Sequence, residues 1–431
     1  MTGAAPRLGA LDAPEPGLER AVRVPARPGL GLLQAALEGG LEPSVFWEDE
    51  DEVLVGLGVR DEIRAGGPDR FERADAALAA RARPSERWFG GFSFEDGEHP
   101  DFAAFGSLRF FLPRIVWRWR RGDSAALLGA GRGVDDFSFR RAVAWAEADR
   151  TVPAPNQGPA AARADRAGWR ERMAAGSAAL AEGRVSKVVL SRRIEVEAER
   201  PLDVAAVLAA LPRRNEAEAA FALFAGDACF LGLSPERLVR VEGHRAWTEA
   251  LAGTSPAQDP DGLALSSSDK DREEHRHVLE HLVRTLGERA ERVEADDVPS
   301  VRCLGPLAHL CTPVHAVGVD PGHLLSLAGA LHPTPAVCGV PPEAAAGVIG
   351  AAEGAPRGWY AGGLGWVCPG GSGPGAPDGR CELRVALRSA LVRGHRATVF
   401  VGAGIVRGST EAAEWEETAL KATRTLRALG A

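Results

Sequence analysis

Two acidic segments of this 431-residue sequence carry charged side chains at the spacing that places them on one face of a helix. Asp271 and Glu274 lie three residues apart, and Glu414, Glu417 and Lys421 follow the same rule near the end of the chain. Adjacent like charges are unfavourable unless a cation lies between them. Oxygen ligands without histidine or cysteine suit a hard ion, so the two segments together indicate Mg²⁺ rather than Zn²⁺. Taken singly, either segment is more typical of a solvated helix face.

One lysine and one glutamate occupy positions that suit acid–base chemistry. Lysine is rare among the 51 basic residues, and Lys187 lies within the strand-like run VSKVVLSRR. A desolvated lysine can lose its proton and act as a base. Glu236 follows Pro235 at a break between two strand-like runs, where a carboxyl group at the lip of a cleft can donate a proton. The open alternatives are a lysine that faces solvent from an edge strand and a turn glutamate paired with a nearby arginine.

Strand-like and helical patterns alternate along the chain and predict a mixed α and β fold. The part up to about residue 150 contains no recognisable catalytic constellation. Residues 151–167 are rich in proline, alanine and polar residues and predict a surface connection. Beyond it, from residue 168 to 431, the pattern indicates an antiparallel meander with inserted helices. The predicted helices cover Arg70–Arg83, Gly168–Gly183, Pro201–Leu211 and Glu411–Leu429.

Composition excludes several classes of protein. With 45% hydrophobic and 26% charged residues, the sequence is typical of a globular protein. No stretch approaches the roughly 20 apolar residues of a membrane span, and the N-terminus lacks the apolar run of a signal peptide, so we expect a cytoplasmic protein. Six scattered cysteines without a CxxC pair give no reason to expect disulfides. The net charge of -8, without a basic stripe, argues against nucleic-acid binding, and the basic run at 114–121 is typical of a strand.

From about Ser186 to the C-terminus, the sequence resembles the chorismate-binding enzyme family, which includes isochorismate, salicylate, anthranilate and aminodeoxychorismate synthases. The resemblance implies an α/β (α+β) fold in which two large antiparallel sheets pack together with helices outside, so that residues 1–150 and 168–431 form one compact unit. The N-terminal part, with FGGFSF and FFLPRIVW, resembles the isochorismate synthase branch less distinctively. The resemblance is carried by SKVVLSRR, LGLSPERLV, ALAGTSP, DKDREEH, LAHLCTPV, LHPTPAVCGVP, WYAGGLGWV, LRVALRSA, VGAGIVRGS and EWEETALK, in the family's order.

The resemblance also implies chemical roles for individual residues. Lys187 would be the general base that activates water for attack at C2 of the chorismate ring, and Glu236 would be the general acid that protonates the departing C4 hydroxyl. Glu274 and Glu417 would hold Mg²⁺, directly or through water, and the ion would bind the ring carboxylate. The carboxylates that support this ion are Asp271 and Glu414.

Further residues would bind the substrate. The resemblance places Arg384, Tyr360 and the backbone of Gly402 on the enolpyruvyl carboxylate. It places the other carboxylate near Lys421 and the Gly253–Thr254 turn. His309 would sit beside the ring, and Ala336, in a segment that resembles isochorismate synthases, is also expected to bind the substrate.

Differences among the family members favour isochorismate synthase. Enzymes that use ammonia typically continue the EH helix with a DLxRND-like segment, whereas this sequence reads VLEHLVRTL. We therefore expect no obligatory amidotransferase subunit, and the resemblance favours a monomer. A salicylate synthase, an anthranilate or aminodeoxychorismate synthase component, and a non-enzymatic chorismate-binding protein are the alternatives. Whether the product enters menaquinone or siderophore biosynthesis stays open, and the glycine-rich stretch 368–380 is expected to be a surface insertion.

Overall fold

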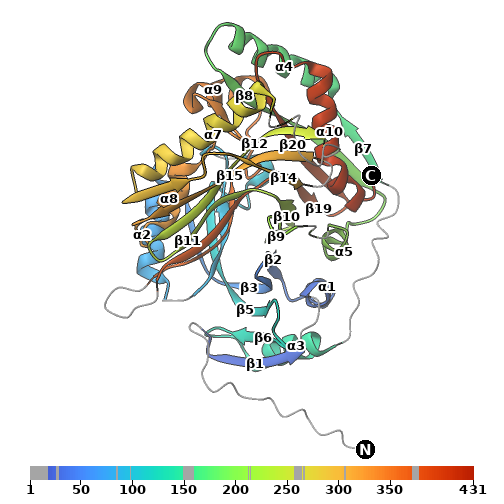
Figure 1. Ribbon diagram of the computed structural model, residues 1–431. Coiled ribbons are helices and arrows are strands. Elements are labelled where there is room, and N and C mark those ends of the chain that lie inside the picture. The colour runs from blue at the N-terminus through green and yellow to red at the C-terminus, as the bar shows by residue number, and fades with distance from the viewer. Residues whose placement is uncertain are drawn as a thin grey trace, which may run out of the picture.

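Antiparallel strands form the framework of the protein in the computed structural model of the chain (Figure 1). The structure describes residues 18–25, 29–83, 86–97, 99–148, 160–211, 213, 215–256, 265, 267–304, 307–370 and 378–431. The strands within these ranges are β1 (Arg20–Pro25), β2 (Pro43–Glu48), β3 (Glu52–Ala65), β4 (Trp88–Phe92), β5 (Leu108–Arg120), β6 (Ala125–Ala130), β7 (Ala160–Ala164), β8 (Lys187–Ala198), β9 (Ala219–Ala225), β10 (Ala228–Ser234), β11 (Arg237–Glu242), β12 (Arg245–Pro256), β13 (Arg292–Ala295), β14 (Ser300–Leu304), β15 (Leu307–Val317), β16 (Gly339–Val340), β17 (Gly363–Cys368), β18 (Arg380–Val385), β19 (Ser389–Arg393) and β20 (Arg396–Ile405).

Consecutive antiparallel pairs join these strands into one hydrogen-bonded ladder. The ladder runs from β15 through β12, β11, β18 and β17 to β4, and continues through β5, β3, β2, β9, β10, β19 and β20 to β8. The pairs β4–β17 and β2–β9 join strands from before residue 150 to strands from after it. The predicted antiparallel α+β fold is therefore confirmed.

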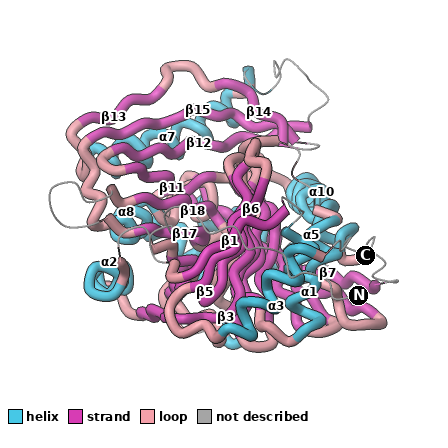
Figure 2. The backbone as a smooth tube through the Cα atoms, turned by 90° about the horizontal axis from the view of Figure 1, so that it is seen from below, coloured by secondary structure: helices cyan, strands magenta, loops and turns pink. Residues whose placement is uncertain are grey.

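Buried apolar side chains alternate between the two faces of the strands and show where the core lies. Trp47, Phe221 and Phe230 belong to the larger apolar cluster of the protein. Their chain neighbours Phe46 and Ala222 belong to a second cluster. Successive side chains of a strand point to opposite faces, so these strands carry one apolar core on each side. Figure 2 shows α1 (Gly29–Gly39) and α3 (Asp136–Glu147) at one end of the molecule, near β1, and α7 (Asp269–Gly287) beside β12 and β15 at the other.

The predicted helices all form, with boundaries that shift by up to three residues. Capping side chains set the starts of three of them, because Asp165 accepts a hydrogen bond from Gly168 N, Asp203 from Ala206 N, and Thr410 from Ala413 N. The remaining helices are α2 (Arg70–Arg81), η1 (Pro100–Phe102), α4 (Arg166–Ala181), α5 (Val204–Ala209), α8 (Leu324–Leu331), α9 (Pro342–Glu353) and α10 (Glu411–Ala428).

The predicted surface connection at residues 151–167 needs correction where the structure describes it. Residues 151–159 lie outside the described ranges. Ala160–Ala164 forms β7, which pairs with the outer part of β8, and α4 begins at Arg166. An alanine-rich edge strand has few bulky side chains to bury, which explains why composition alone indicated a loop. Most of the glycine-rich stretch at residues 368–380, namely residues 371–377, also lies outside the described ranges.

The structure also locates the basic run and the cysteines that were noted in the sequence. The basic run at 114–121 falls almost entirely in β5, as predicted. All six cysteines are free thiols, and of these only Cys303 is exposed. No helix in the described ranges is long and apolar enough to span a membrane.

Candidate active site

A cavity of about 110 Å³ collects most of the predicted site residues in one place. Its walls come from strands β8, β12, β15 and β20, from helices α7 and α10, and from the break between β10 and β11. The predicted residues that line it are Glu236, Asp271, Glu274, His309, Ala336, Tyr360, Gly402, Glu417 and Lys421.

Glu236 lies in the two-residue break that separates β10 from β11, as predicted. Its backbone is held by Ser234, whose hydroxyl accepts a hydrogen bond from Glu236 N at 3.3 Å and donates one to the carbonyl of Val385 at 2.6 Å. Burial is the main cause that raises the pKa of Glu236 to about 8; the neighbouring carboxylate of Glu249 acts in the same direction, and two lysines oppose the shift. The carboxyl group is therefore protonated at neutral pH and can serve as a proton donor.

Lys187 begins strand β8 and is 1% exposed, which excludes the alternative of a lysine that faces solvent. Its Nζ lies 2.8 Å from Oε1 of Glu274 on α7. Lys187 does not line the cavity itself, but both of its close neighbours, Glu274 and Gly404, do. A Cβ atom at Gly404 would lie 3.1 Å from Cε of Lys187 and 3.2 Å from Oε1 of Glu274. The glycine therefore leaves the room in which the lysine reaches the site.

The acidic face near the C-terminus forms a second ion pair. Nζ of Lys421 lies 2.6 Å from Oε1 of Glu417, one helical turn away on α10, and donates to the carbonyl of Gly402 at 3.0 Å. Glu414, one turn earlier on the same helix, is 4% exposed but does not line the cavity. Glu417 and Lys421 therefore lie on one face of α10, as expected from the sequence, and Lys421 connects this helix to strand β20.

Carboxylate oxygens from two helices are available for a hard cation at this cavity. Asp271 and Glu274 come from α7, and Glu417 comes from α10. The described residues contain no group of three or more histidine, cysteine, aspartate or glutamate side chains close enough to hold a metal by themselves. Mg²⁺ commonly binds through one or two carboxylates, several waters and its substrate. The donor set therefore fits Mg²⁺ and does not fit an ion that needs a complete protein cage.

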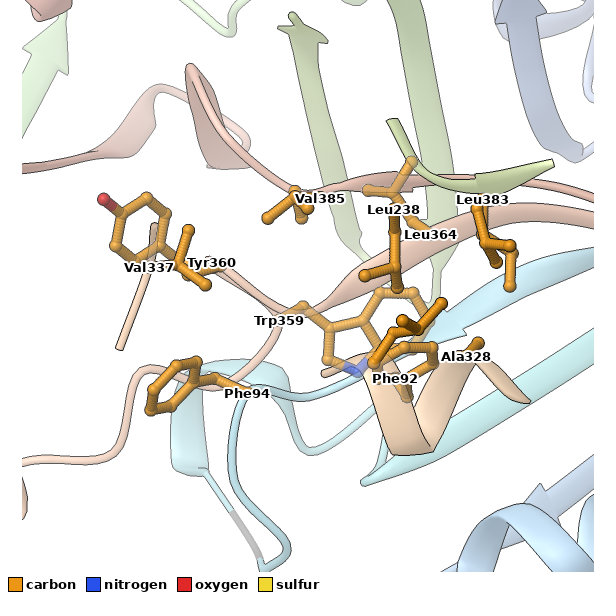
Figure 3. Packing of buried hydrophobic residues seen from close by; sticks show 14 of the residues in the cluster. Phe92, Phe94, Leu238, Ala328, Val337, Trp359, Tyr360, Leu364, Leu383 and Val385 are labelled. Atoms are coloured by element: carbon orange, nitrogen blue, oxygen red, sulfur yellow. The ribbon is translucent and has the colours of Figure 1, made fainter. Parts of the chain in front are cut away.

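Trp359 and Tyr360 follow each other in the chain but point to different places. Figure 3 shows Trp359 deep in the apolar cluster, whereas the ring of Tyr360 lies beside Val337 and directs its hydroxyl group away from Trp359. The Tyr360 ring stacks on Phe400, with 5.4 Å between centroids. Its hydroxyl would lie 2.9 Å from a Cβ at Gly402, so glycine is needed there. Burial raises the pKa of Tyr360 to about 12, which keeps the hydroxyl a hydrogen-bond donor.

His309 is neutral in this site. Burial is the main cause that lowers its pKa to about 3, and the cations Arg388 and Lys421 act in the same direction. Its Nδ1 lies 2.9 Å from the carbonyl oxygen of Gly253, which can only accept, so Nδ1 carries the proton and Nε2 is an acceptor. Gly253 has φ +74 and packs on Asp271. The side chain of Thr254 lies outside the described part of the structure.

The structure places Arg384 away from the cavity and Arg388 in its wall. Nε of Arg384 lies 2.7 Å from Oε1 of Glu382, and its Nη1 donates to the carbonyl of Ala217 at 2.7 Å. The guanidinium of Arg384 therefore binds these two groups outside the cavity. Arg388 lines the cavity from the turn between β18 and β19, with φ +51, and its Nη1 donates to the carbonyl of Lys421 at 3.4 Å. Arg388 was not among the residues predicted from the sequence, although the segment LRVALRSA contains both arginines.

The chain that forms this cavity is similar to known chorismate-binding enzymes. A family model described as "Chorismate binding enzyme" matches residues 18–430. The "Salicylate biosynthesis isochorismate synthase" of Pseudomonas aeruginosa is 35% identical over 422 residues, covering 90% of this chain and 85% of that protein. The isochorismate synthase MenF of Bacillus subtilis is 30% identical over 365 residues, covering 79% of this chain and 74% of its own.

Solved structures show the same fold. The menaquinone-specific isochorismate synthase MenF from Escherichia coli superposes with a TM-score of 0.78 at 27% identity, covering 95% of this chain and 94% of that one. Anthranilate synthase component I from Streptococcus pneumoniae superposes with a TM-score of 0.69 at 20% identity, covering 87% and 92%. At that identity the second likeness concerns the fold alone.

Proposed function

Because the chain belongs to the family of chorismate-binding enzymes, we propose that it is an isochorismate synthase that converts chorismate reversibly to isochorismate. The observation that carries this proposal is the buried carboxyl group of Glu236, whose pKa is raised to about 8, in the same site as the ion pair of Lys187 and Glu274. Exchange of one hydroxyl for another needs an acid at the leaving oxygen and a base at the attacking water. The names of the relatives, which are isochorismate synthases, support the same reaction.

The chemical step balances without any redox partner. The oxygen of a water molecule forms a bond to C2 and gives its proton to Lys187, while the ring double bonds shift and the C4–O bond breaks. The leaving hydroxyl takes the proton of Glu236 and departs as water. Because substrate and product are isomers with the same functional groups, the reaction runs in both directions.

Cationic and hydrogen-bonding groups around the cavity suit a substrate with two carboxylates. Arg388 replaces Arg384 in our assignment, because Arg388 and Tyr360 both line the cavity while the guanidinium of Arg384 is bound to Glu382. A buried guanidinium and a protonated phenol can both donate to a carboxylate. Lys421 supplies a second cation from α10.

We assign Glu274 and Glu417, supported by Asp271 and Glu414, as the residues that would hold Mg²⁺. When bound, the ion supplies a positive charge that binds and orients a carboxylate of the substrate. In this structure each of the two glutamates is paired with a lysine, Glu274 with Lys187 and Glu417 with Lys421. The contact between Glu274 and Lys187 therefore keeps the proposed base directly beside a residue that would hold the metal.

Product identification tests the proposal. Purified protein incubated with chorismate and Mg²⁺ should give a mixture of chorismate and isochorismate, and the same mixture should form when isochorismate is the starting material. Salicylate with pyruvate, or anthranilate when ammonium is added, would instead assign the chain to another branch of the family. We propose that no amidotransferase subunit is required, so the purified chain alone should be active.

A further inference from the structure

A second cavity, of about 440 Å³, adjoins the candidate site. The two cavities share part of their walls: Arg388 and Lys421 line both, together with Pro235 and Leu304. Arg388 and Lys421 therefore stand at the boundary between a small inner cavity and a larger outer one.

The outer cavity is strongly cationic. Arg388, Lys421, Arg424 and Arg427 line it, and Glu218 is the single carboxylate among its described lining residues. The chain as a whole carries a net charge of -8, so its overall charge repels a small anion. The outer cavity therefore differs in charge from the chain as a whole, and it lies directly beside the candidate active site.

Helix α10 arranges three of these cations as a series leading outward. Lys421, Arg424 and Arg427 follow one another at intervals of three residues, which corresponds to about 9 Å along the helix axis from first to last. Lys421 is paired with Glu417, and Arg424 with the buried Glu218. Arg427 is exposed, and no ion pair joins it to another residue that the structure describes.

We propose that this outer cavity is the entrance of the active site and that its cations capture the dianionic substrate before it reaches Arg388. This inference rests on the proposed function, because it takes a dicarboxylate as the ligand. A cavity lined by one sign of charge raises the local concentration of the opposite ion and so accelerates association. Arg427 provides the outermost charge. Arg388 and Lys421, which line both cavities, then bind the carboxylates as the substrate moves into the inner cavity.

Charge reversal at Arg427 tests the proposal, because the residue is exposed and its substitution breaks no ion pair between described residues. Binding of chorismate is followed by stopped-flow tryptophan fluorescence in full-length protein carrying Glu236→Gln, which slows turnover. At about 0.01 M salt the Debye length is about 30 Å, so Arg427→Glu should lower the association rate constant about three- to tenfold. At about 1 M salt, where the Debye length is about 3 Å, the difference should vanish.

A matched control separates a local effect from a change in net charge. Arg140→Glu makes the same charge change on α3, which packs against α1, β1 and β6, and it should leave association unchanged. If Arg427→Glu associates at the parental rate in low salt, or if Arg140→Glu slows association equally, the entrance assignment is wrong. The product formed by the wild-type chain is measured separately, so failure of the proposed function is recognised independently.

A steric variant tests the route without changing charge. Thr423 lines the outer cavity, and tryptophan there should slow association and dissociation of chorismate by similar factors, at any salt concentration. Ala412→Trp places the same bulk on an exposed position of α10 outside both cavities and should change neither rate. Unchanged rates in a folded Thr423→Trp variant would overturn the proposal.

Discussion

Replacement of Glu236 by glutamine should inactivate the protein and make it more stable above pH 4.5, with the full effect reached above about pH 8. The pKa of this carboxyl group is about 8 in the folded protein, against 4.5 for an unperturbed glutamate. One pKa unit corresponds to about 1.36 kcal/mol, so the difference of about 3.5 corresponds to an upper limit of about 5 kcal/mol. Glutamine resembles the protonated acid in shape but cannot ionise.

The sign of the effect follows from the raised pKa. Below pH 4.5 the group is protonated in both the folded and the unfolded chain, so the wild type and Glu236→Gln should have similar free energies of unfolding. As the pH rises to about 8, the unfolded chain ionises while the folded protein still holds the proton, and the wild type loses stability. The variant avoids this loss.

Urea denaturation of both proteins at pH 5 and pH 9 measures the effect. The free energy of unfolding of Glu236→Gln should exceed that of the wild type by several kcal/mol at pH 9, up to the limit of about 5 kcal/mol. Glu199→Gln, which changes an exposed carboxylate, is the control and should show no such difference. Equal stabilities of Glu236→Gln and wild type at pH 9 would refute the assignment of a buried, protonated acid.

The same carboxyl group predicts the pH dependence of catalysis. As a general acid it must be protonated in the free enzyme, so kcat/KM should fall above about pH 8, roughly tenfold per pH unit. Glu249 contributes to the raised pKa of Glu236, and Glu249→Gln should therefore move this fall to lower pH. Glu236→Gln itself should lower kcat by about 10²–10⁴-fold.

Three further predictions concern the other groups of the site. Lys187→Ala should fold and lose about 10²–10⁴-fold in kcat, because no base activates the water; near-native turnover, measured by chromatography of the product, would remove this role. Glu274→Gln and Glu417→Gln should each raise the Mg²⁺ concentration needed for half-maximal activity and weaken chorismate binding in parallel, whereas full activity in a chelator would make these carboxylates structural. Arg388→Gln should raise KM more than tenfold by removing a charged hydrogen bond worth about 1.5–3 kcal/mol, and an unchanged KM would exclude contact with a substrate carboxylate.

Local patterns in the sequence predicted much of the site. The break between two strand-like runs located Glu236 correctly, because proline after a strand interrupts pairing. The i, i+4 spacing of Glu417 and Lys421 placed them on one helical face, which helical geometry alone fixes, and the structure shows that they form an ion pair there. The four predicted helices also formed, because their caps and apolar spacing are local properties.

Long-range contacts could not be predicted from the same patterns. The ion pair between Lys187 and Glu274 joins strand β8 to helix α7, and no spacing rule connects residues so far apart in the chain. The choice between Arg384 and Arg388 depended on where β18 ends, because a residue inside the strand faces its paired neighbours while one in the following turn can reach the cavity. Strand ends are set by tertiary pairing, which the sequence does not display.

Oxygen-18 water tests the central claim most directly, because the account requires that a water oxygen enters at C2 while the C4 hydroxyl leaves. Chorismate is incubated with the purified chain and Mg²⁺ in oxygen-18 water, and the products are analysed by mass spectrometry at low conversion. We predict isochorismate that carries one oxygen-18 atom, in its ring hydroxyl group. Unlabelled isochorismate, or salicylate with pyruvate in its place, would contradict the account.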